Sequence, residues 1–157
     1  MDQQAIVKTF RDKGQVTIKE GNGKVLTLLK SDSWQPEMGK GWMFLLFDLF
    51  QVRSVCVPFS EVSLDVVEFA TKPTIYHSPM NPVIKSAPTQ NGNIRFSLIR
   101  DSNWNKLLFA ISQPVLAGIG EASGSADFQT DLYFPLLGPN TKEMFLGPEG
   151  DIKIIKG

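Results

Sequence analysis

A glycine-rich stretch in the last third of the chain carries the clearest chemical signal in the sequence. Residues 113–124 read QPVLAGIGEASG, and they follow a segment with the apolar spacing of a helix. The stretch predicts a short buried strand that opens into a loop. Strand ends expose backbone N–H groups, and glycine lets a ligand approach them closely. We therefore expect an anion or nucleotide to bind here, with the N–H groups of Gly118 and Gly120 as donors.

Familiar nucleotide and nucleophile motifs do not fit this sequence. In GIGEASG, Ser123 stands where GxGxxG requires its third glycine, and too little chain follows to complete a doubly wound sheet. GNGKV and MGKGW lack the upstream glycine and the hydroxyl residue of a P-loop. The nucleophile elbow GxSxG is also missing. Taken alone, the motifs indicate a soluble α/β domain with one suggestive loop.

Cys56 and His77 are the single cysteine and the single histidine of the chain. One cysteine excludes an intrachain disulfide and fits a reducing compartment, and its VCVP context predicts a small buried hydrophobe. A lone histidine without perturbing neighbours is more often structural than catalytic. Since no cluster has the spacing of zinc ligands, we expect no transition-metal site.

The composition is that of a packed globular chain. With 157 residues, 42% of them apolar and 20% charged, we expect one domain over residues 1–157. Sixteen basic residues balance sixteen acidic ones, so the overall charge does not indicate a nucleic-acid or membrane partner. The N-terminus lacks the apolar core of a signal peptide, and the longest apolar run, residues 42–50, is too short to span a bilayer. We expect a cytoplasmic protein.

Three helices are predicted from apolar spacing and capping residues. The first covers residues 3–13, the second begins at Ser60, and the third follows Asp101 or Ser102. Their predicted apolar faces are Ile6, Val7 and Phe10; Val62, Val66 and Phe69; and Trp104, Leu107, Leu108 and Ile111.

Short extended segments make up most of the remaining chain. Two strands flank the turn residues GNG and predict a hairpin, and a turn at Asn91-Gly92 predicts an antiparallel pair of residues 82–87 and 94–100. The run at 42–50 belongs to the core as either a strand or a buried helix. Together the elements predict a twisted, open, mixed α+β sheet with about three helices. The other predicted strands are residues 16–19, 25–29, 55–57, 74–77 and 151–156.

The second half of the chain resembles the YrdC/YciO family of threonylcarbamoyl-AMP synthases. SPMNPVI at 78–84 and IRFSLIRDS at 94–102 resemble two conserved strand segments of that family. The helix at 103–112 and PVLAGIGEASG at 114–124 follow in the family's order, and MFLGPEGDIKIIKG ends the chain as the family's domain ends. The resemblance rests on order and apolar pattern more than on identities. It implies a YrdC-like fold with a shortened or divergent N-terminal half.

The resemblance is weakest at the residues that carry the family's chemistry. Pro114, Leu116, Ser123 and Gly124 match the family's loop, but its TSAN is replaced by residues 118–121, GIGE. That replacement brings an apolar isoleucine and a glutamate that would repel phosphate. Of the RxPD segment before the helix, only the aspartate carries over, and the N-terminal half lacks both PTxTVYGL and a clear KRxxxK motif.

The resemblance implies condensation of threonine, bicarbonate and ATP to threonylcarbamoyl-AMP, with release of pyrophosphate, in the modification of tRNA. The leaving phosphates need cations or Mg²⁺. No catalytic base can be named. The candidate nucleotide- or anion-binding residues are Arg53, Lys85, Arg95, Arg100, Gly118, Gly120, Ser123 and Gly124.

Three accounts remain open at this level. The chain is a divergent family member that binds a nucleotide, RNA or both, or it keeps the fold as a binding or regulatory module that has lost catalysis. The third account is an unrelated interaction domain of mixed α/β fold.

Overall fold

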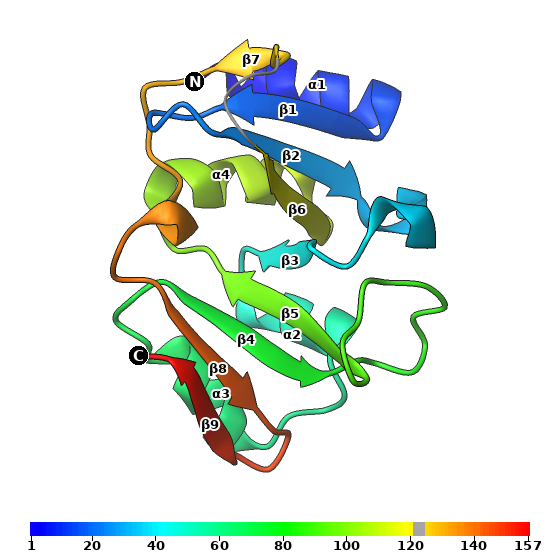
Figure 1. Ribbon diagram of the computed structural model, residues 1–157, viewed down its shortest axis with the longest axis vertical. Coiled ribbons are helices and arrows are strands. Elements are labelled where there is room, and N and C mark those ends of the chain that lie inside the picture. The colour runs from blue at the N-terminus through cyan, green and yellow to red at the C-terminus, as the bar shows by residue number, and fades with distance from the viewer. Residues whose placement is uncertain (121–124) are drawn as a thin grey trace.

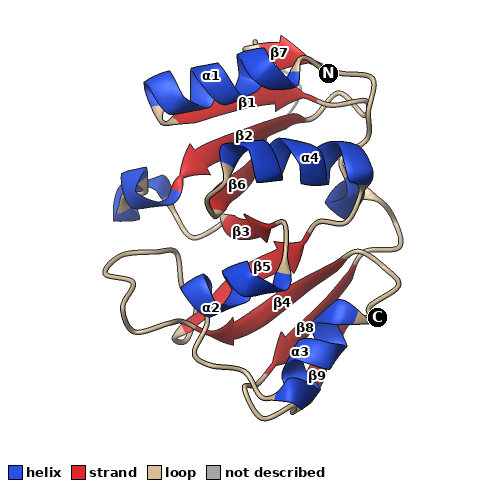
Figure 2. Ribbon diagram, turned by 180° about the vertical axis from the view of Figure 1, so that it is seen from behind, coloured by secondary structure: helices blue, strands red, loops and turns tan. Residues whose placement is uncertain are grey.

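One mixed sheet of nine strands, with four α-helices packed against it, forms the described part of the molecule (Figures 1 and 2). The computed structural model describes residues 1–120 and 125–157. The helices are α1 (Gln3–Lys13), α2 (Val52–Val55), α3 (Glu61–Glu68) and α4 (Ser102–Ile111). The strands are β1 (Gln15–Lys19), β2 (Val25–Lys30), β3 (Met43–Leu46), β4 (Thr74–Pro79), β5 (Asn93–Leu98), β6 (Val115–Gly120), β7 (Phe128–Gln129), β8 (Lys142–Leu146) and β9 (Ile152–Lys156).

The strands lie in the order β7-β1-β2-β6-β3-β5-β4-β8-β9, and parallel and antiparallel pairs alternate irregularly along the sheet. This confirms the predicted mixed α+β sheet, with one short helix more than expected. No helix among the described residues has the length and apolar character needed to cross a membrane.

Two apolar cores use opposite faces of the central strands. On β3, Met43 and Leu45 point into the core beneath α1 and α4, whereas Phe44 and Leu46 point into the core beneath α2 and α3. All four side chains are buried. A strand covered on both faces has no polar alternation, which explains why the run at 42–50 could be assigned from sequence only to the core.

The twist of the sheet brings both pairs of helices to one side of the molecule. Neighbouring strands rotate by roughly 20–25°, so nine strands turn the sheet through about half a turn. For this reason α1 and α4 at one end and α2 and α3 at the other all face the viewer in Figure 2, although they cover opposite faces. The other side, in front in Figure 1, carries no described α-helix, and we call it the open side of the sheet.

Local sequence signals confirmed by the structure lie mainly at helix ends and tight turns. The Asp2 carboxylate accepts a hydrogen bond from the Ala5 N–H at 3.1 Å and begins α1, and Gly14 ends it at a φ of 75°. The GNG hairpin joins β1 and β2 as predicted. Helix α4 buries all four residues of its predicted apolar face. One of these, Trp104, also donates from its indole to the Tyr133 carbonyl at 3.0 Å.

Two predicted strands are wrong. Residues 52–55 form α2, and Cys56 makes only an isolated bridge to Met80, where residues 55–57 were expected to be extended. Residues 82–87 contain no strand, so β5 pairs with β4 instead. The Asn91-Gly92 turn itself is present, with Gln90 and Asn93 exchanging both backbone hydrogen bonds around it.

The predicted apolar face of α3 is wrong for Val62 and Phe69, whereas Val66 packs against the core as predicted. Val62 and Phe69 are 59% and 71% exposed, while Ser63 and Val67 are buried. The Ser63 hydroxyl lies 2.7 Å from the Gly147 carbonyl and 2.9 Å from the Pro148 carbonyl. Ser63 therefore contacts a segment that is distant in sequence. The face of α3 that carries Ser63 and Val67 is the face that packs against the sheet.

Candidate functional site

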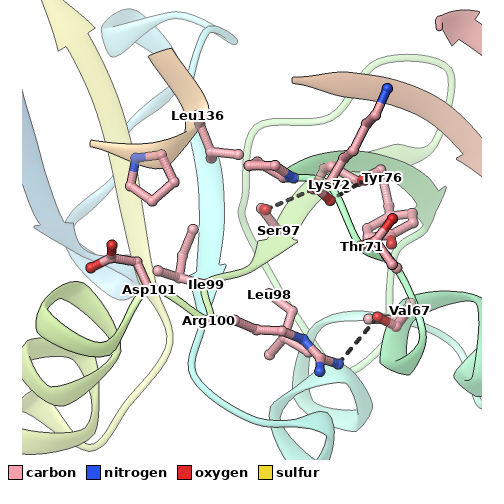
Figure 3. A pocket seen from close by; sticks show the side chains of 14 residues that line it. Val67, Thr71, Lys72, Tyr76, Ser97, Leu98, Ile99, Arg100, Asp101 and Leu136 are labelled. Atoms are coloured by element: carbon pink, nitrogen blue, oxygen red, sulfur yellow. Dashed lines mark hydrogen bonds between the residues drawn. The ribbon is translucent and has the colours of Figure 1, made fainter. Parts of the chain in front are cut away.

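A hollow of ≈ 280 Å³ lies at the carboxyl end of β5, where the chain leaves the sheet for α4 (Figure 3). We call it the β5 pocket. Its floor comes from the end of β5 and the start of β4, and its walls come from residues 70–73 and the 3-10 turn Pro135–Leu137. The volume is close to the lower limit for small-molecule sites, roughly 300–1,000 Å³. Its polar lining consists of Thr71, Lys72, Thr74, Tyr76, Ser97, Arg100 and Asp101.

Arg100 forms the wall of the pocket toward α3. Its Nη2 donates to the Val67 carbonyl at 3.3 Å, in the last turn of α3, where helix carbonyls lack partners within the helix. A guanidinium has five N–H donors, so this contact leaves several of them for a ligand. The side chain is exposed, and a ligand in the pocket can reach it.

Hydroxyl groups on the pocket floor are already engaged as donors. The Ser97 hydroxyl donates to the Thr74 carbonyl at 2.7 Å, and the Thr74 hydroxyl donates to the Lys72 carbonyl at 2.9 Å (Figure 3). Both oxygens therefore remain available as acceptors. The amino group of Lys72 extends away from the hollow toward solvent in Figure 3, so it lies at the rim rather than on the floor.

Tyr76 brings a neutral hydroxyl to the pocket. Burial raises the pKa of Tyr76, and the nearby polar side chain of Thr74 and the charge of Arg100 oppose that rise only in part. Its ring stacks on Phe96 with centroids 5.1 Å apart, which holds the side chain in place. A phenol with a raised pKa stays protonated at neutral pH, so Tyr76 serves as a hydrogen-bond partner and not as a base.

Asp101 has the role predicted from sequence, as the cap of α4. Its Oδ1 accepts from the backbone N–H groups of Asn103 at 3.1 Å and Trp104 at 3.3 Å. These N–H groups are the ones that an anion would use at a helix N-terminus. The carboxylate therefore occupies that position, and the cationic groups of the pocket are the side chains of Arg100 and Lys72.

Gly118 and Gly120 lie in a paired strand, whereas the sequence predicts an open loop here. Strand β6 continues to Gly120, and the two glycines are in register with Thr27 and Val25 of β2. A Cβ atom on Gly118 would lie 3.0 Å from the Trp42 ring, so glycine here lets the indole pack against the strand. The other two residues predicted in this stretch, Ser123 and Gly124, lie outside the described residues.

Arg95 lies on the open side of the sheet and not in the β5 pocket. Its Nη2 is 3.5 Å from the Trp42 carbonyl, so Trp42 contacts both Arg95 and Gly118. The remaining predicted cations, Arg53 on α2 and Lys85 in the loop between β4 and β5, are exposed and do not line the pocket. The structure thus leaves Arg53, Lys85, Arg95 and Arg100 at separate places.

His77 and Cys56 lie outside the β5 pocket. His77 Nε2 lies 2.6 Å from Glu143 Oε2, which links β4 to β8 across the open side. Cys56 is buried, as predicted, and burial raises the pKa of its thiol. In the described part of the chain, no group of three or more His, Cys, Asp or Glu side chains is placed to hold a metal ion.

Of the pocket lining, the sequence indicates Arg100 as a candidate anion-binding residue and Asp101 as a helix cap, and it does not indicate the other residues. Ser97 carried a usable signal, because a serine inside an apolar strand must find a hydrogen-bond partner when buried. That signal does not say where the partner is. Lys72, Thr74 and Tyr76 reach the pocket only because β4 pairs with β5, which the sequence did not predict.

Comparisons with known proteins show the fold of the chain. No protein-family model and no curated protein matches the sequence. Among solved structures, full-length HypF in its phosphate- and nucleotide-bound form is similar, with a TM-score of 0.68 and 13% identity over 98% of this chain. The chain spans 28% of the HypF chain. The MTH1692 protein from Methanobacterium thermoautotrophicum is also similar, with a TM-score of 0.57 and 11% identity over 98% of this chain and 85% of that one. The chain therefore has a YrdC-like fold.

Proposed function

We propose that this chain binds a nucleotide, with the phosphate-bearing end in the β5 pocket. The proposal rests on the position of Arg100, whose exposed guanidinium lies beside a hydroxyl-lined hollow at the end of β5. Arginine binds phosphate through paired N–H donors. The similar HypF structure is of a phosphate- and nucleotide-bound form, which supports the same class of ligand.

The remaining groups of the pocket suit the neutral part of a nucleotide. Ser97 and Thr74 have donated their hydroxyl hydrogens to carbonyls, so their oxygens accept hydrogen bonds from a ligand. The ribose hydroxyls, which lie next to the phosphates, supply such donors. At ≈ 280 Å³, the pocket encloses part of a nucleotide, and the rest would lie outside it.

We favour a binding module over an active synthase. The synthase reaction needs a base and several cations placed before charge develops. In the pocket, Tyr76 stays protonated at neutral pH and the Asp101 carboxylate caps α4. Asp101 is the one carboxylate among the described lining residues, and it is engaged as the cap of α4. These residues therefore do not form a protein site for Mg²⁺. A Mg²⁺ ion that arrives with ATP would keep phosphate and water ligands.

The biological setting that we propose is tRNA modification, as the YrdC/YciO resemblance implies. In that setting the chain would contribute nucleotide binding, while another protein carries out threonylcarbamoyl transfer chemistry. The balanced charge of sixteen basic and sixteen acidic residues favours weak, salt-sensitive contact with tRNA over tight binding.

Calorimetric titration of ATP into the purified protein tests the proposal. We expect saturable binding that Arg100→Gln weakens by about tenfold, because a charged hydrogen bond is lost. Lys85→Gln is the matched control, since it also removes an exposed cation but lies outside the pocket. Equal affinity of the wild type and Arg100→Gln, or a lack of binding, would overturn the nucleotide proposal.

A second assay separates binding from catalysis. Pyrophosphate release is followed with ATP, threonine, bicarbonate and Mg²⁺, with and without tRNA. We expect release at the background rate while ATP still binds. Release above background that Arg100→Gln abolishes would establish a synthase and refute the binding-module account.

A further inference from the structure

A second and larger cavity, of ≈ 630 Å³, lies between α2, residues 57–59 and the beginning of α3. We call it the α2 cavity. Its walls are almost entirely apolar, and its volume is within the range of small-molecule sites, roughly 300–1,000 Å³. The apolar walls are formed chiefly by Leu49, Val52, Val57, Pro58, Phe59 and Leu64.

Among the polar side chains that line the α2 cavity, the Arg53 guanidinium is the one charged group. The Asn81 amide donates to the Arg53 carbonyl at 2.9 Å, and its oxygen accepts from the Val83 N–H at 3.0 Å. Burial raises the pKa of the Cys56 thiol, so that group stays neutral. The Arg53 guanidinium makes no salt bridge within the described residues, and no described Asp or Glu side chain lines the cavity.

The position of Arg53 at the rim follows from the packing of α2. Val52 and Val55 are buried in the core beneath the helix, which leaves Arg53 exposed beside the cavity. Phe50, which also lines the cavity, is 75% exposed. An apolar ligand would bury part of this ring, and apolar surface removed from water stabilises a complex.

We infer that the α2 cavity binds a small amphipathic carboxylate, with its apolar tail inside the cavity and its carboxylate paired with Arg53. The apolar walls match the tail, and the free guanidinium matches a carboxylate, which it can bind through two parallel N–H donors. This inference is independent of the β5 pocket, because the two cavities share no lining residue.

Decanoate is a suitable probe, and amide chemical shifts in ¹H–¹⁵N NMR spectra report both where and how tightly it binds. We expect shifts concentrated at residues 49–59 and 81–82. Arg53→Gln should weaken the binding by about tenfold, as expected for the loss of a charge-assisted hydrogen bond. Lys85→Gln and Arg100→Gln should leave decanoate affinity unchanged. Both decanol and decyltrimethylammonium should bind more weakly than decanoate.

Several results would overturn this inference. Equal affinity for decanoate and decanol would show that Arg53 does not select the head group. Shifts centred elsewhere, or a lack of binding at millimolar decanoate, would show that the α2 cavity is not the site. Because Arg53 is exposed, its substitution should leave the fold intact, and the dispersion of the variant's spectrum verifies this. A Leu64→Trp variant, which fills the cavity from another wall, should also abolish binding.

Discussion

The β5 pocket and the glycine-bearing segment of β6 both lie at strand ends, but the residues around the two ends are packed differently. Strand β6 stays paired with β2 through Gly120, and Trp42 packs over Gly118. Strand β5 ends at Leu98, and the chain turns at once into α4, which leaves a hollow beside Arg100. Glycine spacing therefore marks a place of close packing in this fold, and the departure of the chain from the sheet creates the cavity.

The largest effect is expected from removing the support of the pocket on its α4 side. Trp104→Ala should lower the free energy of unfolding by about 3–5 kcal/mol, because a fully buried aromatic side chain is truncated. The indole also packs edge-on against Phe134 and bonds to the Tyr133 carbonyl. Urea denaturation measures the loss. Phe109→Ala, at an exposed position of the same helix, should cost less than about 1 kcal/mol. Similar losses for both variants would contradict the packing described.

A smaller loss of stability should follow from changing the pocket floor. Ser97→Ala removes the donor to the buried Thr74 carbonyl, and an unsatisfied buried group costs about 1–3 kcal/mol. The same denaturation experiment applies, with Ser54→Ala on the exposed side of α2 as the control. If Ser97→Ala is as stable as the control, the hydroxyl does not organise the floor.

The two strand ends should differ in their contribution to ligand binding. Arg100→Gln should reduce ATP affinity by about tenfold, because a charged hydrogen bond is lost, whereas Gly118→Ala should change it by less than about twofold. The added methyl of Gly118→Ala meets the Trp42 ring at 3.0 Å, so its effect should appear in stability instead. Calorimetry and thermal unfolding on both variants separate these effects. If Gly118→Ala weakened ATP binding more than Arg100→Gln did, the nucleotide site would lie at the end of β6 and not in the β5 pocket.

The smallest expected effect concerns alkaline stability. Burial raises the pKa of Tyr76 above its ordinary value of 10.0, so the folded state favours the protonated phenol. Its contribution to stability is complete below about pH 10 and is lost as the pH rises through the folded-state pKa. Tyr76→Phe should make unfolding free energy fall less steeply between about pH 9 and about pH 11. Equal slopes for wild type and Tyr76→Phe would contradict the burial effect.

Local signals in the sequence predicted most helices and the first hairpin. Asp2 and Gly14 bound α1, Asp101 caps α4, and GNG forms a turn, because each acts within a few residues of itself. The errors arise where distant contacts decide. Ser63 contacts the Gly147 and Pro148 carbonyls, and the face of α3 that packs on the sheet is therefore not the one with Val62 and Phe69.

The candidate site was predictable only in part, for the same reason. Arg100 and Asp101 lie between a recognisable strand and a recognisable helix, and the sequence indicated them as a candidate cation and as a helix cap. The pocket floor needs the pairing of β4 with β5 and the approach of residues 135–137, which belong to separate parts of the chain. No local pattern in residues 71–74 (TKPT) or 74–77 (TIYH) indicates that these segments lie close to residues 135–137.

Mapping amide chemical shifts during titration with ATP tests the central claim most directly. The account predicts that the largest changes fall on residues 71–76 and 97–101, around the β5 pocket, while residues 115–120 of β6 stay unchanged. It also predicts that Arg100→Gln suppresses these changes at the same ATP concentration. Shifts centred on residues 115–120, or a spectrum that ATP does not alter, would contradict the assignment of the β5 pocket as a nucleotide site.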